Sequence, residues 1–265
     1  MKREFAVLGM VICLLIGGLG GWLVPAFIGG QLRVSLLDQI NARGYMIVGT
    51  SGGWPPFEIY NTVTDELEGF DIDLCNLIAD ELNVTIEWQD MAFDALVGSC
   101  VGGTIDLIAA AMFITPERIE VLASSVPYIR TNEVVISLVN ESFTIDDLTD
   151  LTAYSVVVQT GTAEQYELDD LIDAGYSITY TDLPEPDVVI QALVNGIYDV
   201  AFVDEPVFTV WSKTYNLKSI FTVLAEPTAL FTRLGEPEFL GVVNKVIVEA
   251  YKDGTLDALI DKWFT

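Results

Sequence analysis

Residues 109–118 have the sequence Ala-Ala-Ala-Met-Phe-Ile-Thr-Pro-Glu-Arg, and this stretch decides the fold assignment of the chain. It follows a predicted strand at residues 105–109 and ends at Arg118, one of two arginines between Arg43 and Arg233. In an open α/β sheet, the carboxyl ends of the strands border a crevice where ligands bind. A guanidinium group there can donate two parallel hydrogen bonds to one carboxylate. The stretch therefore predicts a carboxylate receptor.

Other motifs flank this stretch in the order Gly-Thr (49–50), Trp-Pro-Pro-Phe-Glu (54–58), Gly-Phe-Asp-Ile-Asp (69–73), Phe93 and Ser-Ser-Val-Pro-Tyr (124–128). As a set, these motifs and their spacing resemble the extracytoplasmic amino-acid-binding proteins of ABC importers, that is, bacterial solute-binding proteins of family 3. The resemblance runs from about Leu37 to Phe264, which is nearly the whole chain after the N-terminal segment.

Short apolar runs alternate with amphipathic segments, which predicts βαβ units and a parallel sheet. One α/β set lies between residues 45 and 109, a second between 155 and 203, and two helices are predicted at 237–253 and 255–263. The resemblance implies a two-lobed periplasmic-binding-protein-like (type 2) fold with two crossing hinge segments. The expected domains are lobe 1, formed by residues 31–132 and 225–265, and lobe 2, formed by residues 133–224.

The composition excludes several classes of function. The formal net charge of −27 argues against nucleic acid or an anionic membrane surface as a partner. The chain has no histidine, which removes Ser-His-Asp and Cys-His catalysis and the commonest metal ligand. We therefore expect no cofactor, no metal centre and no nucleic-acid partner.

Residues 1–30 are expected to form an N-terminal membrane anchor or signal segment. Lys2 and Arg3 precede an apolar stretch at residues 5–28, long enough as a helix to span a hydrocarbon core of about 30 Å. The basic end predicts a cytoplasmic N-terminus and an exported body. A retained anchor and a cleaved signal both stay open, since residues 24–26 are compatible with cleavage. The expected location is extracytoplasmic, either anchored to the cell membrane or released.

The resemblance assigns the carboxylate of the ligand to Arg118. The alternative is a surface salt bridge between Arg118 and Glu117 or Glu120. Related proteins usually carry Ser or Thr where this chain has Phe113, and that hydroxyl helps to hold the carboxylate. Backbone groups of the same segment would have to replace it here, so Ala111 and Phe113 are included among the expected ligand-binding residues.

Asp204 follows the last predicted strand of the second α/β set, just before Glu-Pro. The resemblance implies that its carboxylate accepts a charge-assisted hydrogen bond from the α-ammonium group of the ligand. The alternative is a helix N-cap, a common role for Asp at such a position. The two roles are partly compatible.

By the same resemblance, Trp54 and Phe93 sandwich the side chain of the ligand, although core packing is the alternative for Phe93. Family members that prefer cationic side chains often carry Asp at the position of Ser51, so we expect an amino acid with an uncharged side chain. The second lobe would close on the carboxylate through a turn at a helix N-terminus, where free N–H groups bind anions. The expected ligand-binding residues of this turn are Thr160, Thr162 and Ala163.

Two further pairs are interpreted as structural. Asp71 and Asp73 point to different faces of a helix start, where the helix dipole favours acids. Cys75 and Cys100 are not expected to form a disulfide with each other. If the strand order is 2-1-3, right-handed crossovers place their two helices on opposite faces of the sheet.

These features predict a protein that closes around a free amino acid and delivers it to an ABC transporter permease. A zwitterion would bridge Arg118 and Asp204 only in the closed form, which is what shifts the population toward closure. Some proteins of this fold are dehydratases or peptidoglycan lyases, but the absent histidine argues against an enzyme. An amino-acid-sensing ectodomain that acts on a separate signalling partner is the alternative.

Overall fold

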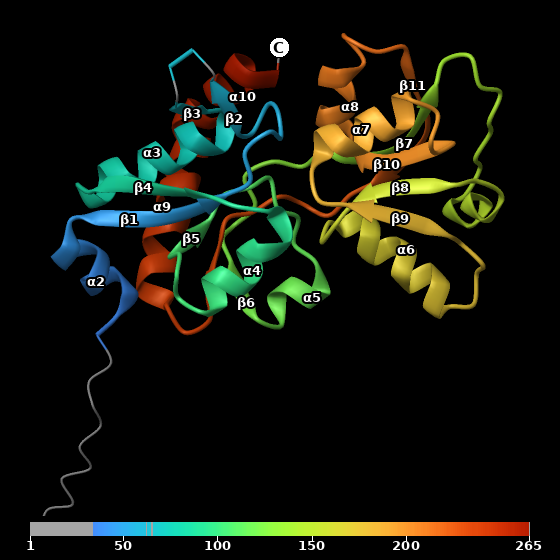
Figure 1. Cartoon of the computed structure of the whole chain (residues 1–265). Helices are drawn as coiled ribbons and strands as arrows, with labels where there is room; N and C mark the ends of the chain where they lie inside the picture. The colour runs from blue at the N-terminus through green and yellow to red at the C-terminus, as the bar shows by residue number, and fades with distance from the viewer. Residues whose placement is uncertain (1–33, 62, 65, 265) are drawn as a thin grey trace, which may run out of the picture. The chain divides into compact units, whose positions relative to one another are not determined.

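The computed structural model describes residues 34–61, 63–64 and 66–264. Within these residues the chain forms two five-stranded mixed sheets and a small hairpin, and helices cover both faces of each large sheet (Figure 1). The expected two-sheet α/β architecture is confirmed. In the same part of the chain, no helix is long and apolar enough to cross a membrane. The predicted anchor or signal at residues 1–30 lies outside the described residues.

The first sheet has the strand order β4-β1-β5-β12-β6. Strand β1 pairs in parallel with β4 and β5, whereas β12 is antiparallel to β5 and β6. The first three predicted strands therefore lie in the order 2-1-3. The strands are β1 (Tyr45–Thr50), β4 (Thr85–Asp90), β5 (Leu107–Ile108), β6 (Leu122–Ser124) and β12 (Phe231–Arg233).

One hydrophobic cluster joins four helices to one face of the first sheet, and α4 covers the other face with a second cluster. The hairpin formed by β2 (Ile59–Asn61) and β3 (Glu66–Glu68) lies beside α3, and the short α5 precedes β6. The helices are α2 (Leu36–Arg43), α3 (Phe70–Leu82), α4 (Phe93–Val101), α5 (Pro116–Ile119), α9 (Pro237–Asp253) and α10 (Thr255–Phe264).

The second sheet has the order β11-β7-β10-β8-β9, with β8, β9 and β10 parallel and β7 antiparallel to β10 and β11. Helices α7 and α8 pack on one face, and α6 with the short 3-10 helix η1 packs on the other. Their bounds are β7 (Asn132–Leu138), η1 (Leu148–Ala153), β8 (Val156–Gln159), α6 (Ala163–Asp173), β9 (Tyr180–Leu183), α7 (Pro186–Val194), β10 (Val200–Asp204), α8 (Glu205–Trp211) and β11 (Leu217–Leu224).

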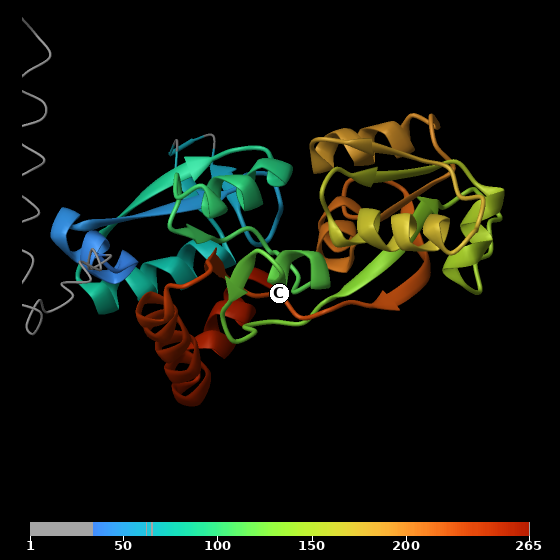
Figure 2. The same ribbon diagram turned by 90° about the horizontal axis from the view of Figure 1, so that it is seen from below.

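The chain passes between the two sheets twice, at residues 125–131 and 225–230 (Figure 2). The two passages are joined to each other, because the N–H of Thr228 donates to the carbonyl of Ile129 at 2.9 Å. The C-terminal helices α9 and α10 then pack against α3 of the first sheet. The lobe boundaries expected from the sequence stay a prediction.

Local sequence explains how the elements around the first sheet begin and end. The Ser35 side chain accepts a hydrogen bond from the N–H of Asp38 and caps α2, and Gly44 ends that helix with φ of 77°. Gly69 begins α3 with φ of 144°, and a Cβ atom there would overlap the carbonyl of Phe57. Only glycine fits at this position.

Cys75 on α3 and Cys100 on α4 are buried and free, in separate hydrophobic clusters on opposite faces of the first sheet. The expectation that they are not bonded to each other is confirmed. The Asp71 carboxylate is buried, where it accepts hydrogen bonds from the N–H of Ala111 and the hydroxyl of Tyr128. Asp73 accepts from the indole N–H of Trp263. Both acids hold structural elements together, as predicted.

Candidate functional site

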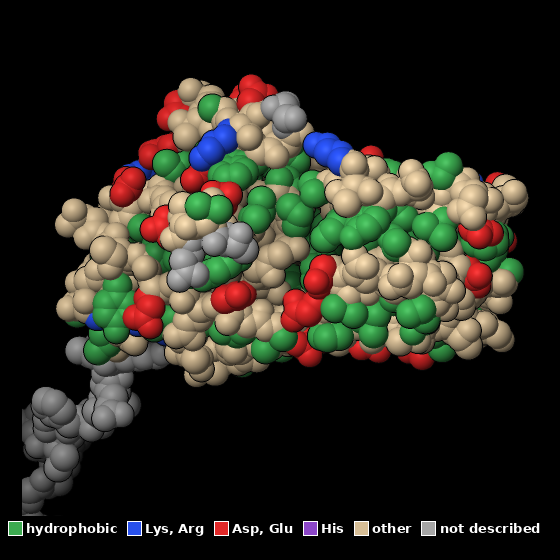
Figure 3. Space-filling view, turned by 45° about the horizontal axis from the view of Figure 1, so that its top comes forward, with side chains coloured by type: hydrophobic (Ala, Val, Ile, Leu, Met, Phe, Trp, Pro, Cys, Tyr) green, Lys and Arg blue, Asp and Glu red, His purple; other side chains and the backbone are tan. Residues whose placement is uncertain are grey.

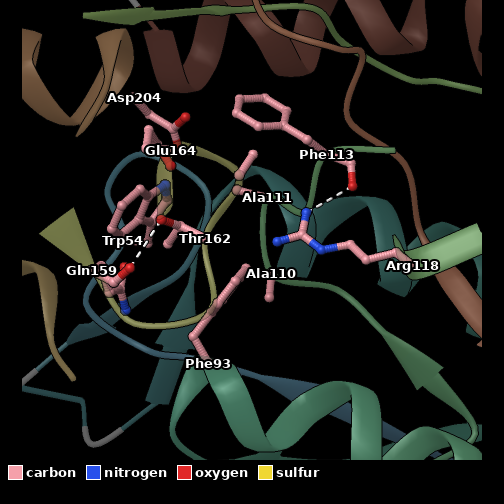
Figure 4. A pocket seen from close by; sticks show the side chains of 11 residues that line it. Trp54, Phe93, Ala110, Ala111, Phe113, Arg118, Gln159, Thr162, Glu164 and Asp204 are labelled. Atoms are coloured by element: carbon pink, nitrogen blue, oxygen red, sulfur yellow. Dashed lines mark hydrogen bonds between the residues drawn. The ribbon is translucent and has the colours of Figure 1, made fainter. Parts of the chain in front are cut away.

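A small cavity with a volume of about 10 Å³ is lined by residues from both sheets and their helices. That volume is about what one water molecule needs, so the lining side chains nearly fill the site. Figure 4 shows Arg118 on one side of it and Asp204 with Glu164 on the other. The lining residues are Trp54, Phe93, Ala110, Ala111, Phe113, Arg118, Gln159, Thr162, Ala163, Glu164 and Asp204.

Arg118 enters the cavity from α5, and the preceding residues set its position. The Thr115 side chain accepts a hydrogen bond from the Arg118 N–H and caps the helix, and Pro116 occupies its first turn. The Arg118 guanidinium donates from Nη1 to the carbonyl of Phe113 at 2.7 Å and from Nη2 to the carbonyl of Gly161 at 3.0 Å. Residues 109–118 thus position one guanidinium group.

Arg118 is 2% exposed, so the alternative of a surface salt bridge is wrong. The rings of Phe93 and Tyr166 lie 5.5 and 5.6 Å from its guanidinium carbon. Burial lowers the pKa of Arg118, although its coulombic interactions with Tyr166, Glu164 and Asp204 oppose the shift. Its Nε has no hydrogen-bond partner among the described residues. A cation in this position gains by binding an anion.

Ala111 and Phe113 form the wall between the two charged sides. Ala111 has φ of 49°, a left-handed conformation that is strained for a residue with a side chain. Phe113 is buried in a small cluster with Ala163 and Ala225, so its ring faces the second half of the molecule. Its carbonyl, not its side chain, contacts Arg118.

Asp204 ends β10 at the position before α8, but its side chain makes no capping hydrogen bond. Instead it lines the cavity, 6% exposed, beside Glu164. Burial raises the pKa of Asp204 well above its usual range, and Glu164 adds to the shift. The Trp54 indole, as a hydrogen-bond donor, lowers that pKa, as does Arg118. The capping alternative is therefore not supported.

Glu164, in the first turn of α6, was missing from the residues expected from the sequence. Its side chain is 2% exposed, and burial raises its pKa to about 7, although a hydrogen bond from its own backbone N–H lowers that pKa. Glu133 on β7 lies next to it, and burial together with Glu164 raises the pKa of Glu133 to about 11. Oxygens of Glu133, Glu164 and Asp204 all lie within 4.8 Å of one another. The acidic side of the cavity is thus a cluster of three carboxylates.

Carboxylate oxygens are ligands for hard cations, so this cluster has the donor type for calcium or magnesium. Calcium takes about six to eight oxygen ligands and magnesium about six, whereas the cluster supplies three residues. The sequence-based expectation of no metal rested on the absent histidine and did not consider these acids. That expectation stays a prediction.

Trp54, Phe93, Thr162 and Ala163 line the cavity as expected. Thr162 precedes α6, and its hydroxyl donates to the carbonyl of Gln159 at 3.0 Å (Figure 4). The aromatic pair comes from the first half of the molecule, and the α6 N-terminus comes from the second.

Two expected residues lie outside the described lining of the cavity. The Thr160 hydroxyl donates to Asp182 at 2.8 Å and is drawn toward the neighbouring strand. Ser51 is buried at the end of β1, but it does not reach the cavity surface. Besides Glu164, the sequence missed Ala110 and Gln159. Ala110 lies inside the stretch at residues 109–118, and Gln159 directly precedes the turn at residues 160–163.

The sequence of residues 46–265 matches the model of a family described as bacterial extracellular solute-binding proteins, family 3. The chain belongs to this family. Its body is therefore that of an extracellular solute-binding protein, as the resemblance implied.

Relatives support the same family and its link to amino acids. The putative ABC transporter arginine-binding protein 2 of Escherichia coli K12 is 27% identical over 81% of this chain and 88% of its own. The L-cystine-binding protein TcyJ of the same strain is 28% identical over 98% and 94%. A crystal structure of a P235GK mutant of ArgBP from T. maritima matches with a TM-score of 0.80 and 32% identity, over 86% of this chain and 98% of that one. These relatives are binding proteins rather than enzymes.

Proposed function

We propose that this protein captures a free amino acid between its two halves and delivers it to the permease of an ABC transporter. The observation that carries the proposal is that Arg118 and Asp204 line one cavity from opposite sides. The carboxylate of an amino acid would bind Arg118 and the N-terminus of α6, and its α-ammonium group would bind Asp204. The side chain would lie between Trp54 and Phe93.

The side chain of the ligand belongs to one of two classes, uncharged or cationic. The uncharged side chain expected from the sequence rested on Ser51, which lies outside the described lining of the cavity, so it stays a proposal. The names of relatives include both arginine and cystine, so family membership does not choose between them. Acidic residues are numerous on the face shown in Figure 3 and basic ones are few, as the net charge of −27 requires. Attraction at the surface would therefore favour cations over anions.

A thermal-shift screen of the full-length chain against each of the twenty protein amino acids and cystine tests the proposal. A ligand present at a hundredfold excess over Kd should stabilise the folded chain by about 2.7 kcal/mol. Calorimetry on the hits then ranks the side chains. If none of these compounds raises Tm, the proposed function is wrong, and tightest binding of arginine or lysine would overturn the uncharged class alone.

A further inference from the structure

More carboxylate side chains surround the cavity than one ammonium group requires as partners. Asp204 and Glu164 both line it, and Glu133 lies behind them on β7. Arg118 is the one cationic side chain in the described lining, and a bound amino acid would occupy it with a carboxylate. One ammonium group would then face at least two carboxylates.

These acids are buried, with oxygens that lack partners. Glu133, Glu164 and Asp204 are 1%, 2% and 6% exposed. One oxygen of each has no hydrogen-bond partner among the described residues, namely Oε2, Oε1 and Oδ1 respectively. Neighbouring buried carboxylates cannot all stay ionised, because desolvation and like charge both oppose it. Protons must neutralise part of the cluster when the cavity is empty.

We propose that Glu164 and Asp204 share one proton in the empty cavity and that the ammonium group of a bound amino acid displaces this proton into solvent. The inference rests on the proposed function and adds Glu164 to the ligand-binding residues. An ammonium group has three N–H donors, so it can bond to an oxygen of each carboxylate. One positive charge leaves as another arrives, and the charge of the cluster stays the same.

The surrounding groups explain why the pair, and not Glu133, releases its proton. Arg118 on α5 faces the pair and favours its ionised form. Glu133 on β7, Glu167 on α6 and Glu58 before β2 face the cluster and oppose ionisation. Glu133 does not line the cavity, so a ligand there does not contact it, and burial raises its pKa to about 11. The pKa of Glu164 at about 7 puts its proton within reach.

Infrared difference spectroscopy of the full-length chain at pH 6 to 7 tests the shared proton, since a protonated carboxyl group has a carbonyl band that a carboxylate lacks. The probe is a saturating mixture of the twenty protein amino acids and cystine. We expect part of the band to disappear when the mixture is added. The Glu164→Gln variant should lack that part from the start. Glu133→Gln is the matched control, because it should remove a part of the band that the mixture leaves unchanged.

Proton release gives an independent measure. Adding the same mixture to the chain in weakly buffered solution below pH 7 should release about one proton per chain, and Glu164→Gln should release none. The apparent affinity for the mixture should fall about tenfold per pH unit below the titration of the pair, and the variant should lose this slope. A purely structural role of Glu164 would change Tm and leave the slope in place.

The possible failures are distinguishable. If the mixture raises Tm but changes neither the carboxyl band nor the proton count, the proposal is overturned and the proposed function stands. If the mixture leaves Tm unchanged, the proposed function fails, and proton displacement by an amino acid fails with it. Loss of the band on adding calcium chloride alone would assign the carboxylate cluster to a metal ion and also overturn the proposal.

Discussion

The Nη2 group of Arg118 donates a hydrogen bond of 3.0 Å to the carbonyl oxygen of Gly161, which joins α5 to the turn before α6. A second contact lies beside it, since a Cβ atom on Gly161 would be 3.1 Å from the Cβ of Asp94 on α4. The two walls of the cavity therefore touch at Gly161. The cavity is therefore closed at this point in the structure.

Gly161→Ala should weaken ligand binding because the added methyl group meets Asp94 only when the cavity is closed. The matched control is Gly175→Ala after α6, where φ is also positive (101° against 77°) but nothing lies within 4 Å of the added methyl group. Both variants incur the backbone strain of a non-glycine residue at positive φ, so they should lose similar stability when empty. Calorimetry should show weaker binding for Gly161→Ala alone. Equal affinities for the two variants would show that closure does not bring Gly161 against α4.

Arg118→Lys and Asp204→Asn should each weaken binding by about 2–5 kcal/mol, or roughly 30- to several-thousand-fold in Kd. An ammonium group cannot donate to Phe113, Gly161 and a ligand carboxylate in the geometry of the guanidinium fork. Asn at position 204 keeps the shape but lacks the negative charge that the α-ammonium requires.

The empty Asp204→Asn variant should melt no lower than wild type, since the carboxylate makes no capping bond and its burial is unfavourable. Arg130→Lys is the control, because Arg130 donates to the carbonyl of Ala225 outside the described cavity lining. Wild-type affinity in Asp204→Asn would remove Asp204 from the ammonium site.

Much of the fold follows from local pattern. The helix predicted at residues 237–253 has the bounds of α9, and the helix predicted at 255–263 is α10, which ends one residue later. The pattern missed β7 and β11, two long antiparallel strands of the second sheet. It also missed β12, which is three residues long and inserts between β5 and β6. These strands depend on pairing partners far away in the chain, and periodicity carries no information about pairing.

In the candidate site, too, the sequence predicts some residues, whereas others depend on packing between distant segments. Arg118 belongs to a motif whose spacing is specific, and the sequence found it. Glu164 has the pattern of an ordinary surface acid in the first turn of a helix, which the dipole favours. Only its packing beside Asp204 and Glu133 buries it. Thr160 was included because it shares a turn with Thr162, but its hydroxyl donates to Asp182 on β9.

The stability of the empty protein should fall as pH rises from about 5 to 8. Burial raises the pKa of Glu164 to about 7 and that of Asp71 to about 6, above the values near 4 of an unfolded chain. The folded state then binds more protons than the unfolded state in this window, so the free energy of unfolding decreases with pH. Thermal melts at constant ionic strength should show a higher Tm at pH 5 than at pH 8.

Glu164→Gln should reduce this dependence, because Gln is neutral at both pH values. The control is Glu120→Gln, which removes one negative charge from an exposed position and tests whether overall repulsion is responsible. A slope that Glu120→Gln reduces as much as Glu164→Gln would attribute the effect to net charge, and a Tm that rises with pH would contradict the assignment of raised pKa values.

Ala111→Gly should leave the stability of the empty protein unchanged or raise it. Ala111 has φ of 49°, which costs an L-residue on the order of 1–3 kcal/mol and costs glycine almost nothing. Glycine loses about 0.4–1 kcal/mol through the greater freedom of the unfolded chain, so the two effects are opposed and relief of strain is the larger. The hydrogen bond from the N–H of residue 111 to Asp71, 2.8 Å long, involves only the backbone and should persist.

The matched control is Ala110→Gly in the same cavity wall, because Ala110 is 2% exposed and is not among the described residues with positive φ. It should lose about 1 kcal/mol, or roughly 2–4 °C in Tm, in differential scanning calorimetry. Equal losses in the two variants would mean that the backbone at Ala111 carries no strain.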